Sequence, residues 1–380
     1  MSSSAKPKIF IVVGTRPEAI KMAPVAVEFQ RFRSVCEPML ISTGQHKEIL
    51  HSSLAAFGVT ADQDLQIMQH GATLAQVTAR ALEGLDGLIE EHRPAFVLGQ
   101  GDTTSTLTAS LASFYRRVPF GHVEAGLRTD TVLNPFPEEF NRRATSLTAD
   151  LHFAPTAWSR DNLLREGKDP ASVFVTGNTV VDAVLATAEG GEQNWFPEFS
   201  GRLILLTTHR RENWGDPQRS IARAARRLIE RFPDTMLVCA LHPNPDVRNT
   251  LEPILGGQER IRLIEPPDYA DFVKLMQRST LILSDSGGVQ EEAPAFGLPV
   301  LVLRTTTERP EGVDAGTAKL VGTDEQVIFD EGCRLLDDPE AYDAMANAVS
   351  PYGDGQTSAR IRYLTLTRLG ISSPEVSMWQ

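Results

Sequence analysis

Cysteine is scarce in this sequence, and long hydrophobic runs are missing from it. Only three cysteines occur in 380 residues, and no CxxC spacing joins any of them. Neither a disulfide framework nor a zinc site is therefore supported. The apolar run near the N-terminus, residues 9–13, is too short for a signal segment or a membrane span. We therefore expect a cytoplasmic protein without a bound metal.

Two common phosphate-binding signatures and an excess of positive charge are also missing. No GxGxxG and no GxxxxGK[ST] segment occurs, which argues against NAD-binding and P-loop proteins. The net charge of −12 argues against nucleic acids and anionic membranes as main partners, because the overall field repels phosphate. A phosphate-bearing ligand must then be held by local positive groups.

The composition is that of a folded protein, with 41% hydrophobic and 23% charged residues, and the length suits two domains. Short apolar runs alternate with amphipathic stretches, which predicts strands and helices in alternation. The expected strands are 8–15, 38–43, 95–102, 118–126 and 150–156, then 202–209, 234–243, 260–266, 280–288 and 298–304. Helices are expected at 17–33, 73–91, 104–116 and 357–369.

Apolar strands of this kind are buried on both faces, which indicates parallel sheets covered by helices. The rhythm restarts after the polar, Gly-containing stretch 187–201, which we interpret as a linker. The predicted fold class is α/β, with two doubly wound, Rossmann-like parallel-sheet domains. Ligands of such folds bind beyond the carboxyl ends of the strands, so a cleft between the domains is the expected site.

Polar residues follow the expected strands of the first half. Arg16 lies beside a helix start and would suit an anion pocket, although a solvent-facing Arg in an ordinary turn is an equal alternative. Asp102 and Glu124 each follow a strand, and Glu138 opens a helix. Each carboxylate alone is more often a helix cap or a surface ion partner. Together they suggest a proton-transfer site, in which separated pKa values supply one base and one acid.

The second half offers a helix start that could hold a diphosphate. The segment 286–288, Ser-Gly-Gly, would present free backbone N–H groups, and Glu291 and Glu292 within the helix could reach a ribose diol. Such a start is structural more often than functional. His209 is the better candidate, because a His flanked by two arginines is poorly placed for core packing. His242, before a proline, is ambiguous.

Nine segments of the chain, in their order, resemble the bacterial UDP-N-acetylglucosamine 2-epimerase family. They cover nearly the whole chain and read GTRPEAIK, TGQH, GDTTS, HVEAGLRT, PFPEEFNR, TTHRREN, HPNP, SDSGGVQEEAP and TTERPEG. One such motif would be weak evidence, but nine in register are highly specific. The resemblance implies a GT-B-like fold with domains at 1–185 and 186–364, UDP held mainly by the second, and a C-terminal helix at about 365–380 that packs back on the first.

The resemblance also implies a reaction that needs no cofactor or metal. A base removes the C2 proton, UDP leaves C1 by anti elimination to give 2-acetamidoglucal, and UDP returns syn after protonation on the opposite face. Asp102, Glu124, Glu138 and His209 fall on the family's acid/base positions, with Asp102 and Glu138 expected around C2 and His209 near the phosphate-sugar oxygen. The UDP-contacting positions are Arg16, Arg211, His242, Ser286, Gly287, Gly288, Glu292, Thr307, Glu308 and Arg309, with Glu292 on the ribose. The family also suggests a homodimer.

The sequence departs from the family where many members hold a second, regulatory UDP-N-acetylglucosamine. There the family reads Gln-His-Arg-Gln/Glu-Met, whereas this chain has Gln45, His46, Lys47, Glu48 and Ile49. The family also has an Arg shortly before Gln-Ser/Thr-Leu, and this chain has Gly71 in its place. Losing that guanidinium removes bidentate phosphate binding, and a lysine does not restore a planar fork. We expect activation by substrate to be weak or absent.

Three other functions are compatible with parts of this pattern. A hydrolysing epimerase would use the same cleft and release N-acetylmannosamine and UDP. A GT-B glycosyltransferase would share the Ser-Gly-Gly segment but would not need the three carboxylates. A UDP-sugar-binding protein without activity would tolerate loss of the carboxylates and of His209, all of which are present.

Overall fold

A computed structural model describes residues 6–44, 47–69, 71–190 and 194–379. The chain divides into two compact units: Met1–Ala186 together with Tyr352–Gln380, called unit 1 here, and Thr187–Pro351, called unit 2. Across the described residues, every helix is too short or too polar to span a lipid bilayer.

Unit 1 is built on a parallel sheet with seven strands among the described residues, in the order β3-β2-β1-β4-β5-β6-β7. The central strands are apolar and buried on both faces, which is why they occupy the middle of a sheet covered by helices. The strands are β1 (Lys8–Val13), β2 (Glu37–Ser42), β3 (Gln63–Asp64), β4 (Phe96–Gln100), β5 (Phe120–Val123), β6 (Leu151–Ala154) and β7 (Val173–Val175).

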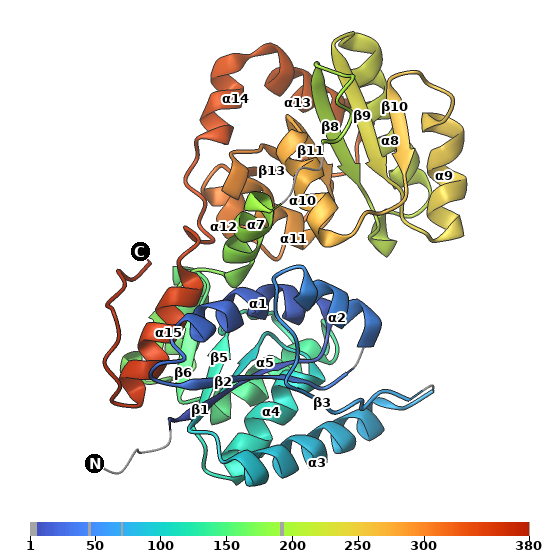
Figure 1. The fold of residues 1–380 in the computed structure, drawn as a ribbon. Helices are drawn as coiled ribbons and strands as arrows, with labels where there is room; N and C mark the ends of the chain where they lie inside the picture. Colours follow the sequence, from blue (N-terminus) through green and yellow to red (C-terminus); the bar gives the residue numbers. More distant parts are fainter. Residues whose placement is uncertain (1–5, 45–46, 70, 191–193, 380) are drawn as a thin grey trace. The chain divides into compact units, whose positions relative to one another are not determined.

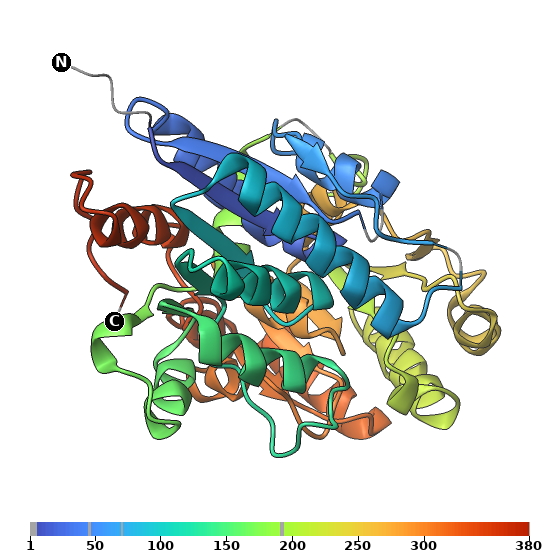
Figure 2. The same cartoon turned by 90° about the horizontal axis from the view of Figure 1, so that it is seen from below.

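Helices cover both faces of this sheet. The helices of unit 1 are α1 (Arg16–Arg31), α2 (Lys47–Ala55), α3 (Leu74–His92), α4 (Thr104–Tyr115), α5 (Glu138–Thr148), α6 (Ala157–Arg165), α7 (Thr179–Glu189) and α15 (Thr357–Arg368). One apolar core joins the sheet to α1, α2 and α15, and another joins it to α3 and α4. Figure 2 shows α3, α4 and α5 side by side over one face.

Unit 2 repeats the plan with six parallel strands among the described residues, in the order β10-β9-β8-β11-β12-β13. The strands are β8 (Arg202–Thr207), β9 (Thr235–Ala240), β10 (Ile261–Ile264), β11 (Leu281–Ser284), β12 (Val300–Val302) and β13 (Ala318–Leu320). The helices are α8 (Asp216–Arg231), α9 (Pro245–Leu255), α10 (Tyr269–Arg278), α11 (Gly287–Glu292), α12 (Pro310–Asp314), α13 (Glu325–Asp337) and α14 (Pro339–Ala346). The main core lies between the sheet and α8, α9 and α13 (Figure 1).

The expectation of two doubly wound parallel-sheet units is confirmed, because the strand order in each sheet reverses beside its first strand. Each expected strand and helix has a counterpart in the structure. Strands β3, β7 and β13 were not expected, since they have only two or three residues, too few to show a periodic pattern. The cleft expected between the units stays a prediction.

The first border between the units lies after Ala186, within one residue of the expected position. Helix α7 runs across the first border as far as Glu189, so the predicted linker 187–201 begins as helix; residues 191–193 lie outside the described residues. No glycine or proline interrupts the sequence from Thr179 to Glu189, which explains why the helix continues.

The second border lies at Tyr352, earlier than the expected residue 365, and the whole of α15 belongs to unit 1. The buried Asp182 of α7 accepts hydrogen bonds from the backbone N–H groups of Thr357 and Ser358, at 3.2 and 2.7 Å. Ile361 is fully buried in the unit 1 core. These contacts fix the N-terminus of α15 to unit 1.

Candidate functional site

The carboxyl ends of β1, β4 and β5 carry three of the first-half residues that the sequence singles out. Arg16 is the exposed first residue of α1, directly after β1 and the Gly14-Thr15 turn. Asp102 lies in the turn after β4, and Glu124 directly follows β5. A Cβ atom placed on Gly101 would lie 3.6 Å from Glu124 Oε2, so the Asp102 turn and the Glu124 carboxylate are neighbours.

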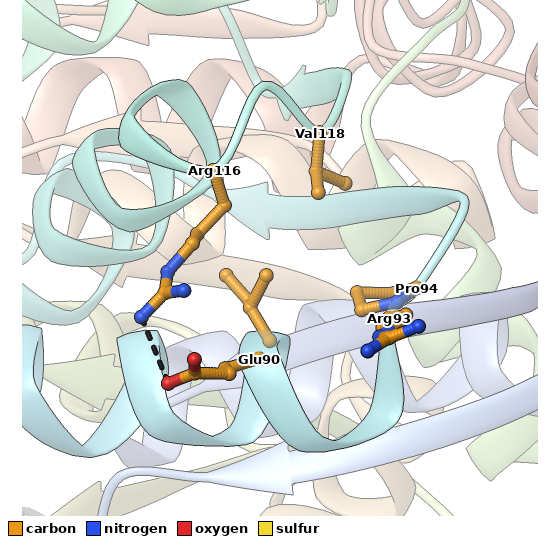
Figure 3. A pocket seen from close by; sticks show the side chains of 6 residues that line it. Glu90, Arg93, Pro94, Arg116 and Val118 are labelled. Carbon is orange, nitrogen blue, oxygen red and sulfur yellow. Dashed lines mark hydrogen bonds and ion pairs between the residues drawn. The ribbon is translucent and has the colours of Figure 1, made fainter.

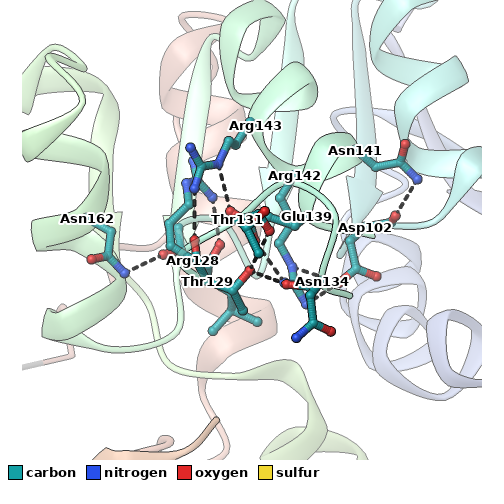
Figure 4. A network of polar contacts seen from close by, with 12 residues as sticks. Asp102, Arg128, Thr129, Thr131, Asn134, Glu139, Asn141, Arg142, Arg143 and Asn162 are labelled. Carbon is teal, nitrogen blue, oxygen red and sulfur yellow. Dashed lines mark hydrogen bonds and ion pairs between the residues drawn. The ribbon is translucent and has the colours of Figure 1, made fainter. Parts of the chain in front are cut away.

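Asp102 is held by an arginine of α5. Arg142 donates from Nε to Asp102 Oδ2 at 2.9 Å, and its NH2 lies 2.7 Å from the same oxygen. Asn141 donates from its side-chain amide to the Asp102 carbonyl at 2.8 Å (Figure 4). The Asp102 side chain is 23% exposed, so a carboxylate fixed by a neighbouring cation remains accessible.

Glu124 lies in a different environment. Its backbone has a φ of 60°, a left-handed conformation that few non-glycine residues adopt. Lys21 Nζ lies 2.5 Å from Glu124 Oε1, the Asn178 amide donates to the same oxygen at 3.0 Å, and Gln100 donates to Oε2. This carboxylate is 7% exposed, and its charge is balanced by Lys21. Strain of this kind is often found at functional sites.

Glu138 and Glu139, the first two residues of α5, have different surroundings. Glu139 is fully buried and forms ion pairs with Arg142 and Arg143, at 3.1 and 2.8 Å. Glu138 is half-buried and has no hydrogen-bond or ion-pair partner in the part of the chain that the structure describes. Glu139 therefore fixes α5, whereas the carboxylate of Glu138 is left available.

Residues 127–137, in the loop between β5 and α5, are held in place by hydrogen bonds and an ion pair that involve Arg143 and Arg128. Arg143 donates to the Thr129 carbonyl at 2.8 Å, and the Thr129 hydroxyl donates to the Asn134 carbonyl at 2.6 Å. Arg128 binds both oxygens of Glu166, at 2.7 and 2.8 Å. This network connects the segment that precedes Glu138 to the rest of unit 1.

Glu18, in the first turn of α1, is an important residue near the carboxyl ends of these strands that the sequence analysis did not single out. It is buried, and it accepts hydrogen bonds from the backbone N–H of Gly14 and Thr15, at 2.9 and 2.7 Å. The hydroxyls of Thr103 and Thr106 donate to its other oxygen at 2.5 and 3.0 Å. Burial raises the pKa of Glu18, although these hydrogen bonds oppose that shift. Glu18 thus connects the Arg16 turn to the Asp102 turn.

Two buried histidines, His122 and His152, lie opposite each other on the neighbouring strands β5 and β6. Burial lowers the pKa of His122 to about 4 and that of His152 to about 3. His122 is therefore neutral at pH 7, and its Nε2 lies 2.7 Å from the Gly101 carbonyl. This contact helps to fix the turn that carries Asp102.

In unit 2, the carboxyl ends of β8, β9 and β11 carry a pair of histidines and a buried aspartate. His209 follows β8, and its ring Nδ1 lies 3.1 Å from Oδ1 of Asp285, which follows β11. The ring of His242, after β9, lies nearly parallel to that of His209, with the ring centroids 6.3 Å apart. Burial, and then the charge of His209, lower the pKa of His242. Asp285 was not among the expected site residues.

Residues 286–288, which were expected to hold a diphosphate, lie at the N-terminus of a short helix, and two arginines lie beside them. Helix α11 begins at Gly287 and has only six residues, and Ser286 makes no side-chain cap. A Cβ atom on Gly287 would lie 3.6 Å from the Arg309 guanidinium carbon and 3.8 Å from Arg210 NH2. Arg210 and Arg309 therefore both bring positive charge to this turn. Gly288, next in the turn, has no backbone strain or close contact.

The loop after β12 forms hydrogen bonds with residues of α11. Arg309 donates to Glu291 Oε1 at 2.7 Å, and the Thr307 hydroxyl donates to the Gln290 side chain at 2.7 Å. Glu308 is bound by Arg304, which lowers its pKa to about 2 in spite of its burial. Glu292 is buried. The exposed Arg211 lies beside the Trp214 ring, 6.0 Å from its centroid, so Arg210 rather than Arg211 is the arginine beside Gly287.

The expected regulatory positions are only partly described. Gln45 and His46 lie outside the described residues, and of Glu48 only its place in α2 is described. Gly71 has a φ of 73°, and a Cβ atom there would meet nothing within 4 Å. A larger side chain at Gly71 is thus opposed by the backbone conformation and not by lack of space.

A separate hollow of about 270 Å³ lies in unit 1 near the amino-terminal ends of β4 and β5. It is lined by Ile89, Glu90, Arg93, Pro94, Arg116 and Val118, which precede β4 and β5 or lie at the ends of α3 and α4 (Figure 3). Ligands of doubly wound sheets bind at the carboxyl ends of the strands, so this hollow is not the candidate site. No group of three or more His, Cys, Asp or Glu suited to a metal occurs among the described residues.

Two doubly wound parallel-sheet units, with polar residues at the carboxyl ends of their strands, place the chain in the GT-B-like class, as do solved structures of similar fold with TM-scores of 0.93 and 0.92. The family model for UDP-N-acetylglucosamine 2-epimerase matches residues 30–364. The chain belongs to the UDP-N-acetylglucosamine 2-epimerase family and is an isomerase of that family.

Individual relatives agree with this assignment. The chain is 49% identical over 358 residues to the UDP-N-acetylglucosamine 2-epimerase of Bacillus subtilis, covering 94% of each chain. The crystal structure of UDP-GlcNAc 2-epimerase from Neisseria meningitidis bound to UDP-GlcNAc has a TM-score of 0.84 and 44% identity, covering 95% of this chain and all of the other. The S. aureus MnaA–UDP structure has a TM-score of 0.88 and 43% identity, over 98% of this chain and all of the other.

Proposed function

We propose that this protein interconverts UDP-N-acetylglucosamine and UDP-N-acetylmannosamine without hydrolysing them. A base removes the C2 proton, UDP leaves C1 by anti elimination to give 2-acetamidoglucal, and UDP returns syn once C2 is protonated on the other face. The observation that carries this proposal is the group of carboxylates at the carboxyl end of the unit 1 sheet. Asp102 is paired with an arginine, Glu124 is buried beside Lys21, and Glu138 has no partner in the described chain.

Acid and base chemistry at one carbon needs groups whose pKa values are separated by their surroundings. In the proposal, Asp102 and Glu138 move protons at C2, and Glu124 forms the third acid/base position. His209 acts near the oxygen that joins the sugar to the diphosphate. UDP is assigned to Arg16, Arg211, His242, Ser286, Gly287, Gly288, Glu292, Thr307, Glu308 and Arg309, with Glu292 on the ribose; Arg210 is added to this set because it lies beside Gly287.

The charge at the leaving diphosphate can be stabilised by protein groups alone. Arg210 and Arg309 lie near the start of α11, and oriented cations of this kind stabilise developing negative charge. The structures of relatives bound to UDP-GlcNAc and to UDP support a UDP-sugar as the substrate.

Incubation with UDP-N-acetylglucosamine in D₂O tests the proposal. We expect UDP-N-acetylmannosamine with deuterium at C2, observed by NMR, because the proton is exchanged at that carbon. Release of free N-acetylmannosamine and UDP as the main products would instead establish a hydrolysing epimerase. A product without deuterium at C2 would contradict the elimination mechanism.

We also propose that activation by substrate is weak or absent. The support is the sequence at the regulatory positions, where Gly71 replaces an arginine and Lys47 replaces another. Without these guanidinium groups, a second diphosphate loses bidentate hydrogen bonds. Rates from UDP-N-acetylmannosamine should therefore be measurable without added UDP-N-acetylglucosamine. A strict requirement for the added compound in steady-state kinetics would contradict this prediction.

A homodimer is the proposed assembly. Phe114 and Tyr115 at the end of α4, and Phe140 and Leu147 on α5, are exposed. Helices α4 and α5 pack against each other, so these apolar side chains lie on adjoining elements (Figure 2). Exposed apolar groups on adjoining elements are typical of contact surfaces between proteins. Sedimentation equilibrium would distinguish a dimer from a monomer.

A further inference from the structure

Asp285 has surroundings that fix both its position and its charge. It is fully buried at the end of β11. Its Oδ2 accepts hydrogen bonds from the Thr208 hydroxyl at 2.9 Å, the Arg210 backbone N–H at 3.0 Å and the Asn213 amide at 2.9 Å. Burial alone would raise the pKa of Asp285, but the hydrogen bonds and the nearby His209 hold it below its usual value. Asp285 is therefore a carboxylate at neutral pH.

The other oxygen of Asp285 faces His209. Oδ1 lies 3.1 Å from the backbone nitrogen of His209 and 3.1 Å from its ring Nδ1. An ionised carboxylate can only accept hydrogen bonds, so the Nδ1 atom of His209 must carry a proton. The second ring nitrogen, Nε2, has no hydrogen-bond partner among the described residues, and the side chain is 42% exposed. This nitrogen is the one that a ligand can reach.

His242 has the opposite arrangement of its ring proton. Its Nδ1 accepts a hydrogen bond from the Asn244 backbone N–H at 3.2 Å, so the neutral ring carries its proton on Nε2. Asp285 contacts the His209 ring, the His242 ring lies nearly parallel to it, and Arg210 and Arg211 follow His209 in the chain. Asp285 is the anion in direct contact with the His209 ring, and its charge opposes the positive charge of the adjoining arginines.

We propose that Asp285 is a positioning residue that holds the His209 ring with its proton on Nδ1, so that Nε2 meets the oxygen between the sugar and the diphosphate. This inference rests on the proposed function. When the C1–O bond breaks, its electron pair goes to the phosphate oxygen, and an Nε2–H group of the imidazolium shares its proton with that oxygen. The proton returns fully to Nε2 when the C1–O bond forms again. Asp285 stabilises the imidazolium throughout, as a carboxylate does for a catalytic histidine in other enzymes.

The first test is the position of the proton on His209 in the unliganded protein. ¹⁵N NMR of histidine-labelled protein distinguishes a protonated from an unprotonated ring nitrogen, and the spectrum of His209→Gln assigns the signals. In the neutral ring, we expect a protonated Nδ1 and a bare Nε2. In Asp285→Asn, the amide can face His209 with its NH₂ group, so the proton should shift to Nε2. A wild-type His209 with its proton on Nε2 would overturn the proposal, and this result needs no active enzyme.

The second test is activity. Asp285→Asn should lower kcat by about 10²-fold or more, because the ring loses its orientation and its stabilised charge. Binding of UDP, measured by calorimetry, should change much less than kcat. The matched control is Asn213→Ala, which removes a hydrogen bond from the same carboxylate and from the Leu303 carbonyl but leaves the charge in place. This control should keep the Nδ1–H form and most of its kcat.

The outcomes separate this proposal from the proposed function. Equal losses of kcat in Asp285→Asn and Asn213→Ala, with the His209 proton unmoved, would mean that Asp285 only stabilises the turn, and the proposal would fail. A wild-type protein that releases free N-acetylmannosamine would overturn the non-hydrolysing reaction but would leave the His209 result standing.

Discussion

Asp102→Asn should lower the turnover of UDP-N-acetylglucosamine by about 10²- to 10⁴-fold, the range that general acid–base groups contribute. Asparagine has nearly the same size but cannot take up the C2 proton. The fold should survive, since Arg142 keeps Glu139 as a partner at 3.1 Å and Asn141 binds only the backbone carbonyl of residue 102. An NMR assay of both epimers measures the loss, and the thermal unfolding midpoint checks the fold.

Asp130→Asn is the matched control for this prediction. Asp130 lies exposed in the loop between β5 and α5 and has no hydrogen-bond or ion-pair partner among the residues described. Its replacement removes the same charge from the same unit, so activity should stay within about twofold if long-range electrostatics contribute little. If Asp102→Asn keeps more than a tenth of the wild-type turnover, Asp102 is not the group that moves the proton.

Arg360→Met should destabilise unit 1 by about 1–3 kcal/mol, the cost of leaving buried hydrogen-bond acceptors without their donor. Arg360 is 1% exposed and binds both oxygens of Asp354 at 2.7 Å. It also donates to the carbonyls of Thr176 and Ser377, at 3.1 and 2.6 Å. Methionine fills a similar volume but leaves these acceptors without their donor.

Amide hydrogen exchange is the suitable measurement, because it reports on each unit separately. Protection should fall in α15 and β7 of unit 1, whereas β8 and β11 of unit 2 should be unchanged. Arg368→Met is the control on the same helix: Arg368 is half exposed and lies 3.5 Å from Asp150, an ion pair worth less than about 1 kcal/mol. Similar losses of protection in the two variants would contradict the role assigned to Arg360.

The sequence predicted the fold well where the pattern was strong. Strands such as β1 and β4 are continuous apolar runs, and such runs are compatible with few positions other than the middle of a parallel sheet. It could not predict β13, a strand of three residues whose place depends on pairing with β12. Nor could it locate the second border, since the attachment of α15 to unit 1 depends on Asp182, which is 175 residues away from Thr357 in the chain.

The site was predicted unevenly for a similar reason. Asp102, Glu124 and His209 stand out because they follow strands, and Glu138 because it opens a helix; motif resemblance separates all four from ordinary caps. Glu18 and Asp285 carry no such signal in isolation. Glu18 could be taken for the acid of a capping box, which it also is, and Asp285 for one polar residue among several in SDSGG. A signal was available for both, since each lies within a motif of the family.

By itself, the sequence determined the two sheets, the family and the positions of most polar groups along the chain, because these depend on local pattern and on motif order. The tertiary structure decided what each polar group touches. It made Glu139 a buried partner of two arginines while leaving Glu138 available, and it placed Asp285 against the ring of His209. Hydrogen bonds and burial are set by segments far apart in the chain, and these contacts establish the charge and orientation on which the chemistry depends.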